Sequence, residues 1–239
     1  MKKLKILSCL LVLVFSFQYY VCASGDNLYV KSISNVKETD MFKNILEKTN
    51  STPVENGIMA TFNTHSDKEK VVNEIFKVLT RYSEYNKKIW RNNKIYCIEF
   101  NGYCAEGYVE GVENENYNII TVNIIRKCSQ YKLQDLKSMV DKSLSGRKEK
   151  CKYFEYVKAK TQKQDVSSVN SEIKNILNYY GASDIKTIAL EEGYSSTAYT
   201  HRYEPIQSGI GLIDFNYAVV KYDTGTYIIM GTPEIMVTY

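Results

Sequence analysis

Proline and histidine are scarce in this sequence, and zinc-ligand spacings are missing. The 239 residues include three prolines and two histidines. No C-x2-C pair occurs, and His65 and His201 lie far from the cysteines, so the sequence matches none of the usual zinc patterns. Aromatic residues make up 13% of the chain and are mostly tyrosine. Together with the low proline content, this predicts a folded, strand-rich protein and argues against a disordered chain.

Signatures of common catalytic and phosphate-binding sites are also missing. There is no G-x-S-x-G motif and no cysteine-protease signature, and the G-I-G at 209–211 lacks the third glycine and following helix of a dinucleotide-binding loop. His201 at a strand end and His65 before a helix have ordinary polar or turn roles as their simplest interpretation. Acidic residues in predicted turns are usually solvated: Glu113, Glu115, Glu191 and Glu192. The sequence therefore predicts no catalytic residue, metal or cofactor.

One long apolar run lies at the N-terminus. It spans residues 6–17 after three lysines and is followed by the more polar Q-Y-Y-V-C-A-S. A basic start, an apolar core of about 7–15 residues and small residues at the end predict a secretory signal peptide over residues 1–23, cleaved between Ala23 and Ser24. Gln18 interrupts the run before the roughly 20 apolar residues that a membrane-spanning helix needs. We expect export across the cytoplasmic membrane, to the cell envelope or the medium; an uncleaved N-terminal anchor is the alternative.

Charge of one sign is not in excess once this segment is removed. Residues 1–23 hold three lysines and no acid, so the formal net charge falls from +4 to +1. A nucleic-acid-binding domain usually carries a strongly basic face, and phosphate neutralisation is weak in a nearly neutral chain. We expect no nucleic-acid partner, and contact with the membrane only through the signal segment before cleavage.

The cysteines leave the redox state open. Four lie beyond the signal segment: Cys97, Cys104, Cys128 and Cys151. An even number in an exported chain permits one or two disulfides. Asn101-Gly102 predicts a two-residue hairpin turn, in which Cys104 faces Glu99 and Cys97 lies diagonally on the same face. A Cys97–Cys104 bridge and four free thiols are both consistent with this pattern.

The first half of the chain predicts one strand, two helices and a meander. Residues 24–55 are polar and are predicted to form an N-terminal arm or linker with a short helix over 40–48. A strand over 57–63 precedes S-D-K-E at 66–69, a capping box that begins a helix. Its apolar stripe has helical spacing: Val71, Val72, Ile75, Phe76, Leu79 and Tyr82. Strands over 94–100, 105–112 and 117–126 then form an antiparallel meander, and a helix over 133–144 ends at Gly146.

The second half repeats this order. The predicted elements are a strand over 153–159, a helix over 166–180, strands over 185–191, 196–203, 212–222 and 226–230, and an extended piece over 234–239. V-V-N-E-I-F-K-V-L at 71–79 resembles S-V-N-S-E-I-K-N-I-L at 168–177, and N-Y-N-I-I-T-V at 116–122 resembles T-Y-I-I-M-G-T at 226–232. We therefore predict an α+β fold with duplicated strand–helix–antiparallel meander units, residues 56–150 and 151–239. Together they form one continuous domain with a curved sheet and helices on one face, which leaves the other face to water or a partner.

The C-terminal run carries a family resemblance. Its motifs are S-T-A-Y-T at 196–200, N-x-A at 216–218, G-T-Y at 225–227, G-T-P-E-I at 231–235 and the terminal Tyr239. They resemble the YwmB family, exported proteins of spore-forming, low-GC Gram-positive bacteria with a TATA-box-binding-protein-like fold. The resemblance spans about residues 55–239 and implies two similar halves sharing a curved antiparallel sheet with helices on its convex side. It implies no activity, because the fold does not determine the function.

Tyrosines are concentrated in the second half, where an exposed aromatic face could stack on sugars or anchor a peptide. Strand alternation directs about half of them into the core. The candidate binding surface is Tyr199, His201, Arg202, Tyr203 and Tyr217. Trp90, with Arg91 beside it in a predicted loop, is a further candidate anchor. The sequence thus predicts a non-enzymatic module of the cell envelope that binds a protein, peptide or glycan through its open sheet face. A cell-wall-acting hydrolase is the alternative, and nucleic-acid binding by fold analogy comes third.

Overall fold

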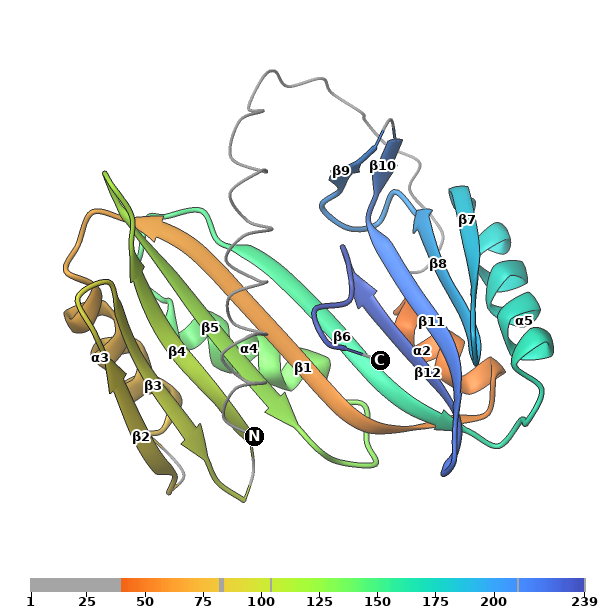
Figure 1. Ribbon diagram of the computed structural model, residues 1–239, viewed down its shortest axis with the longest axis horizontal. Helices are drawn as coiled ribbons and strands as arrows, with labels where there is room; N and C mark the ends of the chain where they lie inside the picture. Colours follow the sequence, from red (N-terminus) through yellow and green to blue (C-terminus); the bar gives the residue numbers. More distant parts are fainter. Residues whose placement is uncertain (1–39, 82–83, 104, 210, 239) are drawn as a thin grey trace. The chain divides into compact units, whose positions relative to one another are not determined.

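The computed structural model describes residues 40–81, 84–103, 105–209 and 211–238 (Figure 1). The helices within these ranges are α2 (Met41–Lys48), α3 (Lys68–Leu79), α4 (Leu133–Ser143) and α5 (Val166–Tyr179). The strands of the first half are β1 (Ser51–Thr64), β2 (Asn86–Arg91), β3 (Ile95–Asn101), β4 (Glu106–Glu113) and β5 (Asn118–Arg126). Those of the second half are β6 (Lys152–Thr161), β7 (Ser183–Leu190), β8 (Gly193–Tyr199), β9 (Ile206–Ser208), β10 (Gly211–Ile213), β11 (Phe215–Tyr222) and β12 (Gly225–Thr232). The protein is α+β, as the sequence predicts.

Ten strands form one antiparallel sheet in the order β2-β3-β4-β5-β1-β6-β12-β11-β8-β7. β1 and β6 are its central pair (Figure 1). Outward from β1 come β5, β4, β3 and β2, and outward from β6 come β12, β11, β8 and β7. The two pairs of similar segments identified in the sequence fall on helices α3 and α5 and on strands β5 and β12. In the strand order, β5 lies next to β1 and β12 lies next to β6.

The helices of the described ranges, α2 to α5, cover one face of the sheet. Ile58, Ala60 and Phe62 of β1 pack in a core cluster with α3 and α4, and Val157 and Ala159 of β6 pack in a second cluster with α2 and α5. Side chains alternate along a strand, and paired residues share a face. The register of β1 and β6 therefore places both clusters on the same side. We call the opposite side the helix-free face.

The helix starts follow local capping chemistry. The side chains of Asp40, Asp67 and Asp165 accept backbone N–H groups at the first turns of α2, α3 and α5. The predicted capping box at residues 66–69 is therefore displaced by one residue. Asp67, not Ser66, is the cap of α3, because its Oδ1 accepts the Lys70 N–H at 2.8 Å. Gly146 and Gly181 follow α4 and α5 with φ of 82° and 76°, as expected for glycine after a helix end.

The linker predicted over residues 24–55 extends too far toward the C-terminus, because its last part belongs to the folded unit. Met41, Phe42, Ile45 and Leu46 of α2 are buried in the second core cluster. β1 begins at Ser51, with a register shift between Pro53 and Glu55 that accommodates a proline inside a strand. The chain is thus part of the folded unit from α2 onward. The signal segment, its cleavage site and residues 24–39 lie outside the described residues.

Three strand predictions also need correction. β3 and β4 are joined by residues 102–105 and not by a two-residue turn, since Asn101 pairs with Glu106. Glu99 therefore faces Tyr108, and Cys97 faces Glu110 as a free, buried thiol. Residues 86–91, predicted as a loop, form the edge strand β2. The predicted strand over 212–222 is divided into β10, which pairs with β9, and β11.

None of the helices in the described ranges combines the length and apolar character needed to cross a membrane.

Candidate functional site

The helix-free face of the first half is built by strands whose larger polar residues point away from the helices. In β4, Val109 joins the helix-side core, whereas Tyr108 and Glu110 point to the opposite face. A Cβ at Gly107 would lie 2.0 Å from the backbone oxygen of Asn123, so glycine there permits the close approach of β4 and β5. The alternation G-Y-V-E-G therefore gives this strand a small, apolar helix side and a polar opposite side.

Antiparallel pairing brings five residues of this face together. Cys97, Glu110 and Thr121 are in register across β3, β4 and β5, and Tyr108 is in register with Asn123. Paired residues on one face have Cβ atoms about 4.5–5.5 Å apart. We refer to Cys97, Tyr108, Glu110, Thr121 and Asn123 as the polar floor.

Glu110 is the most unusual member of the polar floor. It exposes 7% of its surface, and burial raises the pKa of its carboxyl to about 6. Within the described structure its carboxylate makes no hydrogen bond or ion pair. No cation is among the causes of its pKa shift. A buried carboxylate without a partner is costly, so this position contributes little to stability.

Asn123 adds a second acceptor without a partner. Its Oδ1 is buried and receives no hydrogen bond. Its amide stands beside the Tyr108 hydroxyl, whose pKa is raised by burial and by the charge of Glu110. Burial, then Glu110 and then Glu99, raise the pKa of the Cys97 thiol to about 12. Cys97 is therefore a protonated thiol at neutral pH and not a nucleophile. The polar floor offers hydrogen-bond acceptors in a negative environment.

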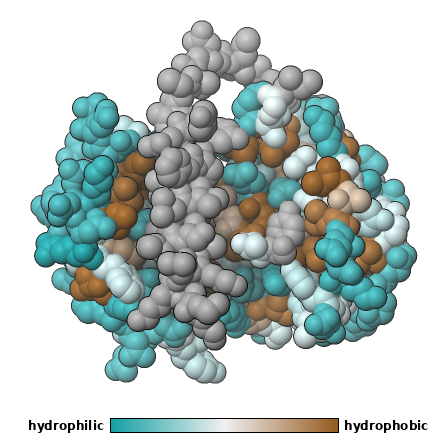
Figure 2. Space-filling model, viewed as in Figure 1, coloured by the Kyte–Doolittle hydropathy of each residue, from teal (hydrophilic) through white to brown (hydrophobic). Residues whose placement is uncertain are grey.

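The chain itself occupies part of the helix-free face in the second half. Ala218, Val220 and Ile229 point to this side and are packed by Ile235 and Val237 of the C-terminal segment. The segment is fixed by the Ile235 N–H, which donates to Asn216 Oδ1 at 3.3 Å. Figure 2 shows hydrophobic side chains gathered in the half of the view that holds β8, β11 and β12. The surface proposed from the sequence is thus restricted here.

Two lysines and two tyrosines border this covered region. The Lys158 ammonium lies 4.9 Å from the ring centroid of Tyr222 and 5.5 Å from that of Tyr227, and Lys160 lies 5.9 Å from that of Tyr227. The two rings meet edge to face at 5.3 Å. These contacts are cation–π interactions within the protein. They show that this end of the face is basic and aromatic, in contrast to the polar floor.

The five residues of the predicted binding surface do not form one surface. The rings of Tyr199 and His201 are in contact, with centroids 3.9 Å apart and planes tilted by 48°, and Arg202 lies 4.5 Å from the Tyr180 ring centroid. Tyr203 is half-buried and packs edge to face on a core phenylalanine of α2. Tyr217 is fully buried on the helix side, where its hydroxyl donates to Asn170 Oδ1 at 2.9 Å. Alternation along β11 accounts for this placement, because Tyr217 shares the side of Phe215 and Val219.

The loop that carries His201 is held by one buried carboxylate. Asp214 accepts the backbone N–H groups of Thr200 at 2.5 Å, Arg202 at 3.0 Å and Tyr203 at 3.2 Å, and the Thr200 hydroxyl at 2.9 Å. His201 itself has a φ of 62° and is exposed, with Nε2 3.4 Å from the Ser183 hydroxyl. Asp214 is thus occupied in fixing the loop and is not available as a partner for His201.

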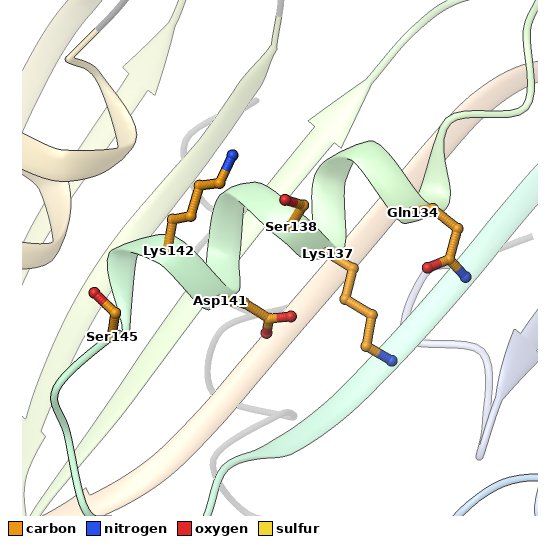
Figure 3. A pocket seen from close by; sticks show the side chains of 6 residues that line it. All are labelled: Gln134, Lys137, Ser138, Asp141, Lys142 and Ser145. Atoms are coloured by element: carbon orange, nitrogen blue, oxygen red, sulfur yellow. The ribbon is translucent and has the colours of Figure 1, made fainter.

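Two surface hollows gather polar side chains. One of about 360 Å³ lies along α4, and its side chains project from one helix and its end without converging on a common point (Figure 3). Two of its charged groups are already paired with β6: Asp141 accepts from the Tyr153 hydroxyl at 2.7 Å, and Lys137 bonds Glu155 at 2.6 Å. This hollow is therefore a groove beside an ordinary solvated helix.

The second hollow, of about 260 Å³, brings His65 near Asp67 and Glu113. A histidine beside carboxylates is the arrangement that a hydrolase would need. Here Asp67 caps α3, and Glu113 is held by Lys68 at 2.5 Å, which lowers the pKa of Glu113. Both carboxylates already have structural partners. Across the described ranges, no group of three or more His, Cys, Asp or Glu side chains is arranged to hold a metal ion.

Sequence reasoning missed the polar floor. Its residues lie on three strands and become neighbours only through the β3–β4–β5 register. One local signal was available in the G-Y-V-E-G alternation of residues 107–111, which places a glutamate and a tyrosine on one side of a strand. The error in the β3–β4 turn concealed it, because that turn paired Glu99 with Cys104.

The chain matches no protein-family model, and no curated protein matches it significantly.

Proposed function

We propose that this protein is an exported binding module of the cell envelope, and that its ligand-contacting surface is the polar floor of the helix-free face. The observation that carries the proposal is the buried acceptor Asn123 Oδ1, which has no donor within the described structure, next to the largely buried Glu110, whose carboxylate has no hydrogen-bond or ion-pair partner there. Each unsatisfied buried polar group costs about 1–3 kcal/mol. A ligand that presents donors to this face would recover that cost.

A binding role fits the chemistry better than catalysis. The thiol of Cys97 and the hydroxyl of Tyr108 have raised pKa values, so neither is an activated nucleophile at neutral pH. The partner is an envelope protein, peptide or glycan. A nucleic acid is disfavoured because the polar floor carries a carboxylate and no lysine or arginine.

We also propose that the two halves of the sheet are copies of one unit. Equivalent strands lie at equivalent places on either side of the β1–β6 pair, and each half has one helix between its first and second strands of the sheet. This arrangement supports an internal duplication with a TATA-box-binding-protein-like fold. It also supports membership of the YwmB family, which the C-terminal motifs suggest. Export rests on the signal segment, and N-terminal sequencing of protein from culture fractions tests it: a product in the cytosol that begins at Met1 would contradict it.

Binding is tested with protein isolated from a host that exports it. The protein is mixed with solubilised envelope fractions, and retained components are quantified for the unmodified chain and for Asn123→Leu, which removes one acceptor. Glu113→Gln is the matched control, because Glu113 lies on β4 but is exposed and paired with Lys68. We expect saturable retention that Asn123→Leu weakens and Glu113→Gln leaves unchanged. Equal retention by all three proteins, or none by any, would reject the proposal.

A further inference from the structure

We infer that the polar floor recognises a cationic nitrogen group, an ammonium or a guanidinium, carried by a peptide ligand, with Glu110 as its counter-charge. The inference rests on the proposed binding function and adds the chemistry of the ligand. Glu110 is more than nine-tenths buried, yet its carboxylate has no partner in the described structure. An ionised carboxylate in such a place is stabilised by an opposite charge that also donates hydrogen bonds.

The surroundings of Glu110 favour a cation over an anion or a neutral group. Two carboxylates lie on this part of the face, since Glu110 is in register with Cys97 and Glu99 is in register with Tyr108, so the charge around the polar floor is negative. Within the polar floor, no side chain is cationic. The other titratable groups that face Glu110 are Cys97 and Glu99 on β3 and Tyr108 on β4, while β5 contributes only Thr121 and Asn123. A neutral donor would leave the carboxylate charge uncompensated.

The second acceptor points to a peptide. Asn123 Oδ1 requires one N–H donor. Asn123 lies on β5 two residues after Thr121, which is the register partner of Glu110. That step is about 6.6–6.8 Å along a strand. A side-chain ammonium or guanidinium at Glu110 and a backbone N–H of the same ligand at Asn123 satisfy both acceptors. Free inorganic cations could compensate the charge but would not supply the donor that Asn123 requires.

An aromatic residue at the edge of this face already holds an ammonium group. Trp90 is in register with Cys97 and exposes 47% of its surface, and the Lys88 ammonium lies 3.7 Å from its ring centroid. This contact is a cation–π interaction on the same side of the sheet as Glu110. A ligand cation beside the polar floor would therefore lie between Trp90, at the edge of the sheet, and the Glu110 carboxylate.

The test uses three small probes with the same backbone: Nα-acetyl-lysine amide, Nα-acetyl-arginine amide and Nα,Nε-diacetyl-lysine amide. Binding to the exported protein is followed by NMR, using the amide signals of Glu110 and Asn123 and the carboxyl carbon of Glu110. We expect the lysine and arginine probes, which are cationic, to bind and the neutral diacetyl probe not to bind. Whichever cationic probe binds more tightly identifies the preferred group, an ammonium or a guanidinium. Affinity should fall about tenfold between pH 7 and pH 5, as Glu110 becomes protonated.

Two variants complete the test. Glu110→Gln should weaken the cationic probes at least about tenfold, and Glu113→Gln should not. Equal binding of the diacetyl probe, or unchanged binding to Glu110→Gln with its fold intact by circular dichroism, would overturn the inference. Retention of an envelope component that depends on Asn123 but not on Glu110 would leave the proposed function standing and reject the inference. If the cationic probes bind at Glu110 but no envelope component is retained, the proposed function is rejected and the cation-binding inference stands.

Discussion

The ring of Tyr156 on β6 occupies the space that a side chain at Gly57 on β1 would need. A Cβ built at Gly57 would lie 1.9 Å from Cε1 of Tyr156, and the two residues are partners in the central strand pair. The Tyr156 hydroxyl donates to Glu55 Oε1 at 2.7 Å, which fixes the ring in place. The pairing of β1 with β6, which connects the two halves of the sheet, therefore requires a residue without a side chain at position 57.

Gly57→Ala should be strongly destabilising. The added methyl group must displace the Tyr156 ring, and overpacking of this kind costs about 1–3 kcal/mol. Urea unfolding monitored by circular dichroism measures the loss. Gly211→Ala is the control, because its Cβ would have a single neighbour, the Lys186 ammonium at 3.9 Å. If Gly57→Ala is as stable as that control, the ring does not fill the site in solution.

Glu110→Gln should stabilise the protein at neutral pH. The folded-state pKa of about 6 lies above the ordinary value of 4.5, so the folded state binds more protons than the unfolded state between these values. Stability from this group is therefore present below about pH 4.5 and is lost as the pH rises through about 6, by about 2 kcal/mol in total. The variant removes this loss.

The measurement is the free energy of unfolding in urea from pH 4 to pH 7.5, taken as the difference between Glu110→Gln and the unmodified chain. The difference should grow with pH between about 4.5 and 6 and then level off. Glu113→Gln should show no such rise, because the pKa of Glu113 is lowered. A difference that does not depend on pH would mean that Glu110 is well solvated.

Periodicity predicted most elements of this fold because each has its own apolar pattern. Helix α5 and strand β6 were placed within one or two residues, since Val169, Ile173 and Leu177 mark the buried side of the helix and the strand is a short run rich in aromatic and apolar residues. β2 was missed because all six of its residues are exposed and show no alternation in burial. An edge strand protected by lysines gives no such signal.

The candidate site was harder to predict because it depends on long-range register. Tyr217 lies in a strand as the exposed tyrosines do, and its burial follows from its place on the helix side of β11, which the sequence alone does not reveal. Glu110 and Asn123 are 13 positions apart and become neighbours through the β4–β5 pairing. A one-residue change in the β4–β5 register would place the two side chains on opposite faces of the sheet.

Asp214→Asn should loosen the loop that carries His201. The carboxylate of Asp214 accepts three backbone N–H groups and one hydroxyl, and an amide has a single acceptor oxygen for them. Hydrogen bonds to charged groups contribute about 1.5–3 kcal/mol each, so we expect a loss of at least about 2 kcal/mol. Limited proteolysis should then cut within residues 200–209. Asp223→Asn, in the exposed β11–β12 turn, is the control, and equal protease resistance of the two variants would contradict this role.

The C-terminal segment should protect an apolar part of the helix-free face. Replacing Ile235 and Val237 together by serine removes the side chains that pack on Ala218, Val220 and Ile229. Both residues are half-buried, so we expect a loss of about 2 kcal/mol at about 25 cal/mol per Å² of apolar surface. Binding of the dye ANS should increase at the same time, because the exposed strands present a contiguous apolar patch.

Ile188→Ser is the matched control for this change. Ile188 faces the same side on β7 but exposes 64% of its surface, so its removal should leave both stability and dye binding close to those of the unmodified chain. If the double serine variant also behaves in this way, the C-terminal segment does not cover the face in solution. The second half would then offer an apolar and basic surface around Lys158 and Tyr227, and the ligand surface would extend beyond the polar floor.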